Sequence, residues 1–178
     1  MTVRHYLHHN PKIGTNCYID QQSLVSGQIE LGNDVSIWPM AVLRGDVNWI
    51  KVGDRTNIQD GTCCHTTRVS DENPNGFPLD IGADCTIGHK VTLHGCTIGA
   101  HCLIGIDSTI LDGVIIEPHV MLGAGSLVPP GKVLESGYLW IGRPAIKKRR
   151  LTADELALMA QNVKHYIQLK NNYLKDNR

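Results

Sequence analysis

The sequence predicts an all-β fold, a parallel β-helix of six-residue repeats, followed by a C-terminal α-helix. Three observations predict it. An aliphatic residue recurs every six positions, glycine often follows it, and a small or β-branched residue often stands four positions after it. An amphipathic helix would repeat at 3.6 residues and a single strand at 2, so a period of six fits neither. It fits a triangular solenoid of short parallel strands with roughly 18 residues per coil.

The aliphatic positions divide into three faces of this solenoid. The first face contains Ile13, Leu31, Val52, Ile81, Ile98 and Ile116. The second contains Ile19, Ile37, Ile58, Ile87, Ile104 and Leu122, and the third contains Val25, Leu43, Cys64, Leu93, Ile110 and Val128. Over about residues 11–133 the pattern resembles the left-handed β-helix of hexapeptide-repeat proteins.

The repeat sets the expected domain boundaries. Residues 1–133 form the β-helix, with hexads from about residue 13 and a loop insertion at 66–80, where turn formers and two prolines replace the hexad. Residues 134–150 form a connecting segment, and 151–178 form the C-terminal α-helix and tail. Thr152 and Glu155 make a capping box at the start of this helix. One helix face, expected to pack along the solenoid or a neighbouring subunit, contains Leu156, Met159, Val163, Tyr166, Ile167 and Lys170.

Composition limits the function classes. Lys and Arg total 17, as do Asp and Glu, so no overall field attracts nucleic acid or an anionic membrane. The basic run at 147–150 is interpreted as a solvated linker, because no aromatic residue or motif accompanies it. No stretch approaches the roughly 20 apolar residues of a membrane span, and we expect a cytoplasmic protein. The cysteines form no CxxC pair and are expected to be reduced thiols, with Cys17, Cys64, Cys85 and Cys102 packed in the solenoid.

Two columns of polar residues line neighbouring faces. His65 and His94 each follow the aliphatic residue of the third face in adjacent coils, so their backbones should stack about 4.8 Å apart. Arg44 occupies the same place one coil earlier. On the second face, Asp60 and His89 each stand two places after the aliphatic residue, also in adjacent coils.

Stacked imidazoles can share one metal ion, and a catalytic zinc ion requires a third protein ligand. His89 is the candidate, but a corner separates it from His94, so we expect that one subunit alone does not assemble the site. If the third face of one solenoid packs against the second face of another, cyclic symmetry gives a trimer with three sites. The alternative is that these are ordinary surface histidines, as is expected for His5, His8, His9, His101, His119 and His165.

The motifs resemble a known family. These are RGD at 44–46, NIQDG at 57–61 followed by His65, IGHKVTLHGC at 87–96, SGY at 136–138 and GRPA at 142–145. Together they are similar to the γ-class carbonic anhydrases and their bacterial homologues. The resemblance implies a homotrimer with Zn²⁺, or Fe²⁺ in some members, at each interface. The metal ligands would be His65 and His94 from one chain and His89 from the next.

The same resemblance implies roles for further residues. Arg44 and Asp46 would form an ion pair between subunits, Gln59 would orient the metal-bound hydroxide, and Asp60 would support the site as a hydrogen-bond acceptor. Tyr138 is a catalytic candidate through the resemblance alone. The implied activity is that of a carbonate dehydratase-like lyase, which hydrates CO₂ reversibly to bicarbonate at the trimer interfaces.

One departure from the family concerns proton transfer. Its most active members place glutamates just after the Arg-x-Asp motif and in the loop after the first ligand, where this sequence has Val47 and Arg68. Asp71 and Glu72 in the loop could substitute, and turnover need not be fast. Three alternatives stay open: a hexapeptide acyltransferase with one histidine as general base, a metal-dependent thioester hydrolase, and a catalytically weak trimeric scaffold.

Overall fold

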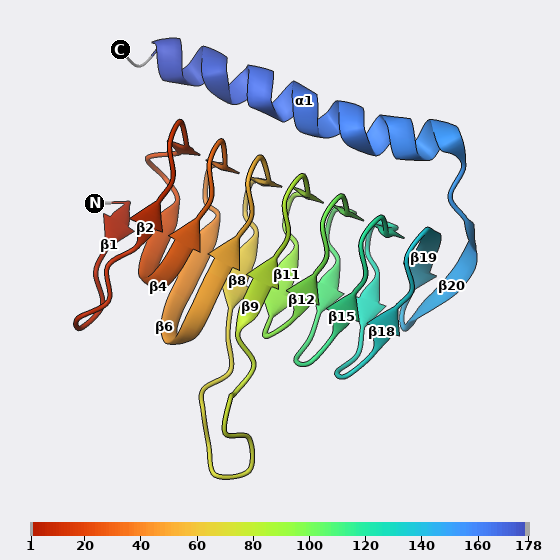
Figure 1. Cartoon of the computed structure of the whole chain (residues 1–178), viewed down its shortest axis with the longest axis horizontal. Helices are drawn as coiled ribbons and strands as arrows, with labels where there is room; N and C mark the ends of the chain where they lie inside the picture. The colour runs from red at the N-terminus through yellow and green to blue at the C-terminus, as the bar shows by residue number, and fades with distance from the viewer. Residues whose placement is uncertain (1, 177–178) are drawn as a thin grey trace.

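The computed structural model describes residues 2–176 and shows a left-handed parallel β-solenoid with an α-helix lying along it (Figure 1). The predicted fold class is confirmed. The register derived from the six-residue period is also found across the loop insertion: Ile58 pairs with Ile87 on the second face, and Cys64 pairs with Leu93 on the third. These four side chains are fully buried, so the core is a stack of aliphatic layers inside the solenoid.

The second face of the solenoid is one sheet. Its strands are β3 (Tyr18–Ile19), β5 (Ser36–Ile37), β7 (Asn57–Ile58), β10 (Thr86–Ile87), β13 (Leu103–Ile104), β16 (Met121–Leu122), β19 (Tyr138–Gly142) and β20 (Ala145–Arg150). The strands from β3 to β19 pair in parallel, one coil on the next, and β20 adds an antiparallel edge. This edge ends the ladder of parallel coils.

The first and third faces belong to a second, bent sheet. Its strands are β1 (Val3–Arg4), β2 (Lys12–Ile13), β4 (Leu24–Leu31), β6 (Val42–Val52), β8 (Cys63–His65), β9 (Leu79–Ile81), β11 (Thr92–His94), β12 (Thr97–Ile98), β14 (Thr109–Ile110), β15 (Ile115–Ile116), β17 (Leu127–Val128) and β18 (Val133–Leu134). The long strands β4 and β6 run through the corner between the two faces, so the sheet is continuous there.

The ladders continue past residue 133, into residues 134–150, which the sequence predicts to be a connecting segment. Leu134 pairs with Ile116 on the first face, and Trp140 pairs with Leu122 on the second. Both Leu134 and Trp140 are buried. Residues 134–150 therefore complete the last coil and cover the end of the core.

The glycines that follow the aliphatic positions serve close packing between coils. A Cβ atom at Gly53 would lie 2.4 Å from the backbone nitrogen of Ala83 in the next coil. The left-handed backbone conformation at the corner is adopted by other residues, with φ of 58° at Asp34, 60° at Arg55 and 57° at Asp84. The turn itself therefore does not require these glycines, and the need for glycine arises from the close approach of the next coil.

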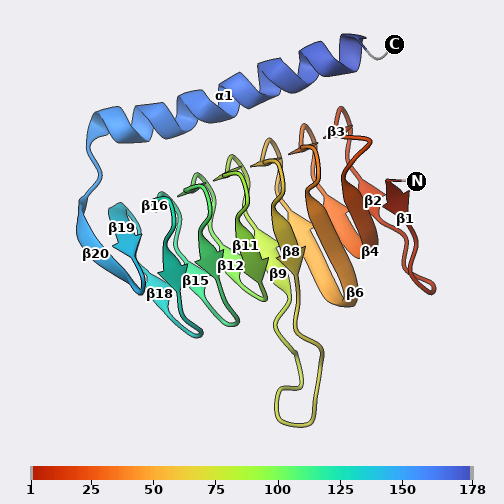
Figure 2. The ribbon, with the colours of Figure 1, turned by 180° about the vertical axis from the view of Figure 1, so that it is seen from behind.

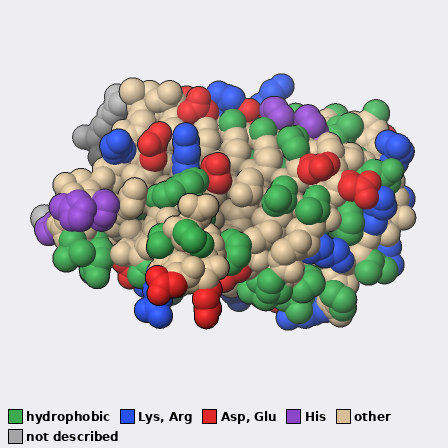
Figure 3. All heavy atoms as spheres, turned by 60° about the horizontal axis from the view of Figure 1, so that its bottom comes forward, with side chains coloured by type: hydrophobic (Ala, Val, Ile, Leu, Met, Phe, Trp, Pro, Cys, Tyr) green, Lys and Arg blue, Asp and Glu red, His purple; other side chains and the backbone are tan. Residues whose placement is uncertain are grey.

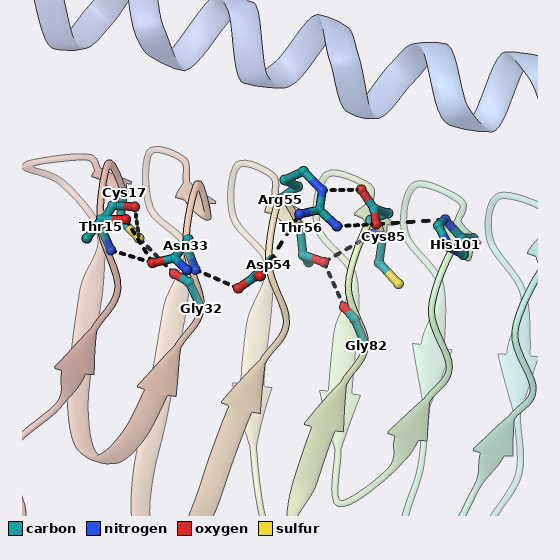
Figure 4. A network of polar contacts seen from close by, with 11 residues as sticks. Thr15, Cys17, Gly32, Asn33, Asp54, Arg55, Thr56, Gly82, Cys85 and His101 are labelled. Carbon is teal, nitrogen blue, oxygen red and sulfur yellow. Dashed lines mark hydrogen bonds and ion pairs between the residues drawn. The ribbon is translucent and has the colours of Figure 1, made fainter.

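Polar contacts run along the corner that faces the helix (Figure 4). Arg55 donates two hydrogen bonds of 2.7 Å to Asp84 in the next coil, and Thr56 Oγ1 donates to the carbonyl oxygen of Gly82 at 2.8 Å. The hydroxyl oxygen of Thr56 also accepts from the backbone nitrogen of Cys85 at 3.0 Å. The two bonds of Thr56 satisfy backbone groups that the corner leaves outside the ladders.

The cysteines lie mostly inside the solenoid, and all six are free thiols. Cys64, Cys85, Cys96 and Cys102 are buried, Cys17 is half-buried and Cys63 is exposed. Burial is the main cause that raises the pKa of the Cys64 thiol well above its ordinary value. Cys64 therefore acts as a small apolar residue in the core.

Helix α1 (Ala153–Asp176) begins with the predicted capping box. The backbone nitrogen of Thr152 donates to Glu155 Oε2 at 2.9 Å, and the backbone nitrogen of Glu155 donates to Thr152 Oγ1 at 3.2 Å. Arg149 adds two hydrogen bonds of 2.8 Å to the same carboxylate and is the main cause that lowers the pKa of Glu155 to about 2. The chain is thereby fixed where it leaves β20.

Helix α1 packs on the second face of its own solenoid, against β3, β5 and β10. Met159 and Val163 are buried there, whereas Leu156 remains 39% exposed at the margin of the contact. The rings of Tyr166 and Tyr173 meet Trp38 edge-on, with centroids 5.5 and 5.4 Å away. Among residues 2–176, no helix has the length and apolar content needed to cross a membrane.

The loop between β8 and β9 projects from the solenoid on the side away from α1 (Figures 1 and 2). It is slightly shorter than the sequence indicates, because Leu79 and Asp80 of the expected insertion already belong to β9. On the side of the molecule from which this loop projects, positive and negative side chains are interspersed (Figure 3). The distribution agrees with the balanced composition and shows no field of one sign on this face.

The fully buried Lys170 ties the end of α1 to the first coils. Its Nζ donates to the carbonyl oxygen of Asn16 at 2.8 Å, to Asp34 Oδ1 at 2.9 Å and to Asn171 Oδ1 at 2.8 Å. The hydrogen bond from Lys170 is the main cause that lowers the pKa of Asp34. A buried cation is tolerated because every donor has an acceptor.

Replacing Lys170 by methionine should therefore destabilise the protein although the apolar stem is retained. We expect Lys170→Met to lower the free energy of unfolding by about 1–3 kcal/mol, because three hydrogen bonds from a charged donor are lost. Urea unfolding measures the change, and Lys164→Met, at an exposed lysine of the same helix, is the matched control. Equal stability of the two variants would contradict this account.

Candidate metal centre

His65 and His94 stand side by side on the third face. His65 ends β8, His94 ends β11, and the two residues are register partners in adjacent coils. Their ring centroids are 5.2 Å apart, and His65 Nδ1 lies 3.2 Å from His94 Nε2. The ladder thus brings two nitrogen atoms to one point outside the solenoid.

A carboxylate holds the far nitrogen of each ring. Asp46 Oδ1 lies 3.0 Å from His65 Nε2, and Asp112 Oδ1 lies 2.6 Å from His94 Nδ1. An ionised carboxylate only accepts hydrogen bonds, so both rings, when neutral, carry their proton on the nitrogen that faces the aspartate. The two nitrogens that face each other then both present lone pairs.

Facing lone pairs repel unless a cation lies between them, and the geometry suits a metal ion. Two nitrogens bound to one tetrahedral zinc ion at about 2.0–2.1 Å lie about 3.3 Å apart. The observed separation is 3.2 Å. Histidines that bind metals usually donate their other N–H to a carboxylate, as His65 and His94 do here. This pair therefore fits zinc as two of its ligands.

Asp46 stays ionised between two donors. Burial raises the pKa of its carboxyl, but the hydrogen bonds from His65 and Arg44 outweigh burial, and the pKa lies below its ordinary value. Arg44 Nη1 donates to Asp46 Oδ2 at 2.6 Å within the same chain. The ion pair that the family resemblance assigns to the subunit interface is thus closed inside the single chain, while the Arg44 side chain remains 47% exposed.

His89 lies away from this pair, in the turn at the end of the second face. It follows β10 and pairs with Asp60 of the adjacent coil, whose Oδ2 lies 2.9 Å from His89 Nδ1. The His89 side chain is 41% exposed, so its Nε2 can face a partner outside the chain. Within residues 2–176, no cluster of three His, Cys, Asp or Glu side chains is arranged to hold a metal ion. The single chain offers a pair and a separate third histidine.

Gln59 lies beside Asp60 on the second face and is buried. Its Nε2 donates to Asn57 Oδ1 at 3.0 Å, and Asn57 Nδ2 in turn donates to Thr86 Oγ1 at 3.1 Å. This chain of hydrogen bonds fixes the orientation of the Gln59 amide. Its oxygen is left as the group that can accept from a ligand.

Tyr138 is not brought to the histidines within the chain. It lies in β19, three ladder steps of about 4.8 Å from β10. Lys147 Nζ stands 4.6 Å from the centre of its ring, and Arg150 Cζ stands 5.1 Å from it. Its aromatic face is therefore occupied by two cations at the end of the solenoid.

Two residues of the site were missed by the sequence reasoning. Asp112, which holds His94, and Thr67, which donates to Asp112 Oδ2 at 2.7 Å, were not among the candidates. A signal for Asp112 existed, because it comes 18 residues after His94 and one coil is about 18 residues long. Thr67 lies in the loop, where no repeat applies.

The remaining histidines differ from these three. His5, His8, His101, His119 and His165 are exposed, and His9 is half-buried. His101 and His119 stack with ring centroids 4.9 Å apart, but the nearest carboxylate oxygen to His101 Nδ1, on Asp84, is 3.9 Å away. Close carboxylate support distinguishes His65, His89 and His94 from these surface histidines.

Comparison with known proteins places the chain among hexapeptide-repeat proteins. A family model described as bacterial transferase hexapeptide (six repeats) matches residues 95–130. A solved structure of a hexapeptide transferase family protein from Anaplasma phagocytophilum superposes with a TM-score of 0.90. It is 37% identical and the match covers 97% of this chain and 98% of that one.

Several relatives match along nearly the whole chain. Protein YrdA of Escherichia coli is 50% identical over 92% of this chain and 89% of its own length. A carbonic anhydrase of Geobacillus kaustophilus is 38% identical over 93% of this chain and 86% of its own length. The mitochondrial gamma carbonic anhydrase 2 of Arabidopsis thaliana is 38% identical over 99% of this chain, which spans 63% of the plant protein.

Proposed function

Because this chain belongs to the γ-class carbonic anhydrase family, we propose that it is a metal-dependent enzyme that hydrates CO₂ reversibly to bicarbonate. Zn²⁺ is the proposed metal, with Fe²⁺ as the alternative. The observation that carries the proposal is the pair of facing nitrogens of His65 and His94, 3.2 Å apart, each ring supported by a carboxylate.

The third ligand is proposed to come from another subunit. His89 is separated from the pair by a corner, yet its ring is held by Asp60 in the same way that Asp112 holds His94. A homotrimer in which the third face of one chain meets the edge of the second face of the next, at the turn that follows β10, would bring His89 of the partner subunit to the pair. Cyclic symmetry then forms three equal sites.

Zinc held by three histidines with an open fourth position lowers the pKa of a bound water to about 7, which supplies hydroxide for attack on CO₂ at neutral pH. Gln59 would accept a hydrogen bond through its amide oxygen and orient the attacking group. Asp60 would keep His89 in the correct tautomer and direction, and Asp46 would do so for His65. Arg44, partly exposed beside Asp46, is the proposed contact to the neighbouring chain.

Release of the proton determines how fast such a site can turn over. Asp71 and Glu72 are exposed near the tip of the loop that begins after His65, and we propose them as proton acceptors. Val47, which is 42% exposed, and Arg68 cannot accept a proton at neutral pH. Turnover is therefore expected to depend on buffer more than in family members with glutamates at those positions.

The shared arrangement of the site can be tested by mixing inactive variants. His65→Ala and His89→Ala should each lose the bound metal. In every mixed trimer, an intact pair meets an intact His89 once, so mixed trimers should recover about one third of the wild-type metal content. Tagging the two variants differently and measuring metal in doubly purified trimers gives the value.

The matched control combines His65→Ala with His94→Ala. Both variants lack one member of the pair, so no arrangement of these subunits completes a site, and metal should stay absent. Recovery of metal in this control, or no recovery in the first mixture, would reject a site shared between subunits.

The catalytic proposal is tested by stopped-flow CO₂ hydration with zinc-loaded and iron-loaded protein. We expect hydration above the buffer rate that disappears in His89→Ala. Metal-replete protein without such hydration would contradict the enzymatic proposal. The likeness to a hexapeptide transferase family structure makes acetyl transfer from acetyl-CoA the rival activity. Metal-independent acetyl transfer, or thioester hydrolysis without CO₂ hydration, would favour the rivals.

A further inference from the structure

The base of the projecting loop contacts Asp112 and lies beside the backbone next to His94. The loop leaves the solenoid directly after His65, and its two sides meet at Thr67 and Phe77. Thr67 N donates to the Phe77 carbonyl oxygen at 2.9 Å, and Phe77 N donates to the Thr67 carbonyl oxygen at 3.0 Å. This pair of hydrogen bonds closes the loop two residues after His65, a proposed metal ligand.

Asn48, in strand β6, also holds the base of the loop in place. Its Nδ2 donates to the carbonyl oxygen of Thr67 at 3.1 Å and to that of Asn75 at 2.9 Å. Gly76 adopts a φ of 58°, and a Cβ atom there would lie 2.7 Å from Asn48 Nδ2. The loop base is therefore held in one conformation by contacts to β6.

Phe77 covers the backbone that carries the pair. A Cβ atom on Gly95, the residue after His94, would lie 2.6 Å from Phe77 Cβ. A Cβ atom on Gly113, the residue after Asp112, would lie 3.0 Å from Phe77 Cε1. The loop thus packs on the two glycines next to the histidine and its carboxylate.

Thr67 donates the hydrogen bond that engages the second oxygen of the Asp112 carboxylate. The carboxylate uses Oδ1 for His94, at 2.6 Å, and Oδ2 for the hydroxyl of Thr67, at 2.7 Å. With both oxygens engaged, the plane of the carboxylate is fixed, and with it the direction of His94 Nδ1–H. His94 Nε2 is consequently directed at His65 Nδ1.

We infer that Thr67 is a positioning residue of the metal site: its hydroxyl fixes Asp112, Asp112 fixes His94, and the loop base thereby sets the affinity of the site for metal. This inference rests on the proposed function for the identity of the ligand. Outer hydrogen-bond partners of metal-binding histidines typically change metal affinity by about 10- to 100-fold. The loop would then contribute both to metal affinity and, through Asp71 and Glu72, to proton transfer.

The test compares Thr67→Val, which removes the hydroxyl and keeps the shape, with Thr67→Ser, which keeps the hydroxyl. Zinc affinity is measured by competition with a chromophoric chelator. We expect Thr67→Val to bind zinc about 10-fold more weakly and Thr67→Ser to bind it nearly as the wild type does. Thr66→Val is the matched control, because the hydroxyl of Thr66 reaches only the Asn48 carbonyl oxygen, at 3.5 Å.

A second readout needs no metal. In the metal-free full-length protein, proton NMR should show a downfield His94 Nδ1–H signal that exchanges slowly with water, assigned by its loss in His94→Gln. The signal should persist in Thr67→Ser and broaden in Thr67→Val. A Thr67→Val variant that keeps the wild-type signal and zinc affinity would overturn the inference. Wild-type protein that binds no zinc would instead reject the proposed function, and the NMR comparison would still decide the role of Thr67.

Discussion

The parallel ladder between successive coils is the constraint on which the rest of this structure depends. Each coil places its residues about 4.8 Å from the same positions of the next, so a fixed spacing in the sequence becomes a contact in space. His65 meets His94 across such a ladder, although 29 residues separate them in the chain. A solenoid with this register positions side chains on rigid strands, as a site with a demanding geometry requires.

Electrostatics then determines what the paired histidines can do. When both rings are neutral, hydrogen bonds to Asp46 and Asp112 place the ring protons on the far side of His65 and His94, so that two lone pairs converge on one point. Such an arrangement is unfavourable in an isolated protein, and a bound cation relieves it. His89, with its own carboxylate on the neighbouring face, has the support of a metal ligand but no second ligand nearby. In the proposed trimer, the third ligand would come from a different chain.

The regular parts of the molecule could be predicted from the sequence, because the six-residue period dictates them. The register across the loop insertion, the stacked pair His65 and His94, and the capping box at Thr152 follow from spacing alone. The hydrogen-bond partners and orientations of individual polar side chains could not be predicted. Arg44 closes its ion pair with Asp46 inside the chain, and the hydrogen bond of Asn57 determines how the Gln59 amide is turned. Such choices depend on rotamers, which the period does not specify.

Contacts made by irregular segments were also beyond prediction. Thr67 and Phe77 reach the Asp112 region through a loop without a repeat, and Trp140 closes the last coil where the hexads had ended by sequence. Their partners are set by the path of the backbone, which only the structure gives. The rigid repeat therefore fixes where the histidines lie, and irregular segments adjust how firmly they are held.

Anomalous diffraction at the zinc edge from crystals of the metal-loaded protein tests the central claim most directly. The account predicts one strong peak per chain, lying between His65 Nδ1 and His94 Nε2 and within bonding distance of His89 of the partner subunit. A peak bound by His65 and His94 without a neighbouring chain, or peaks only at other histidines such as His101 and His119, would contradict it.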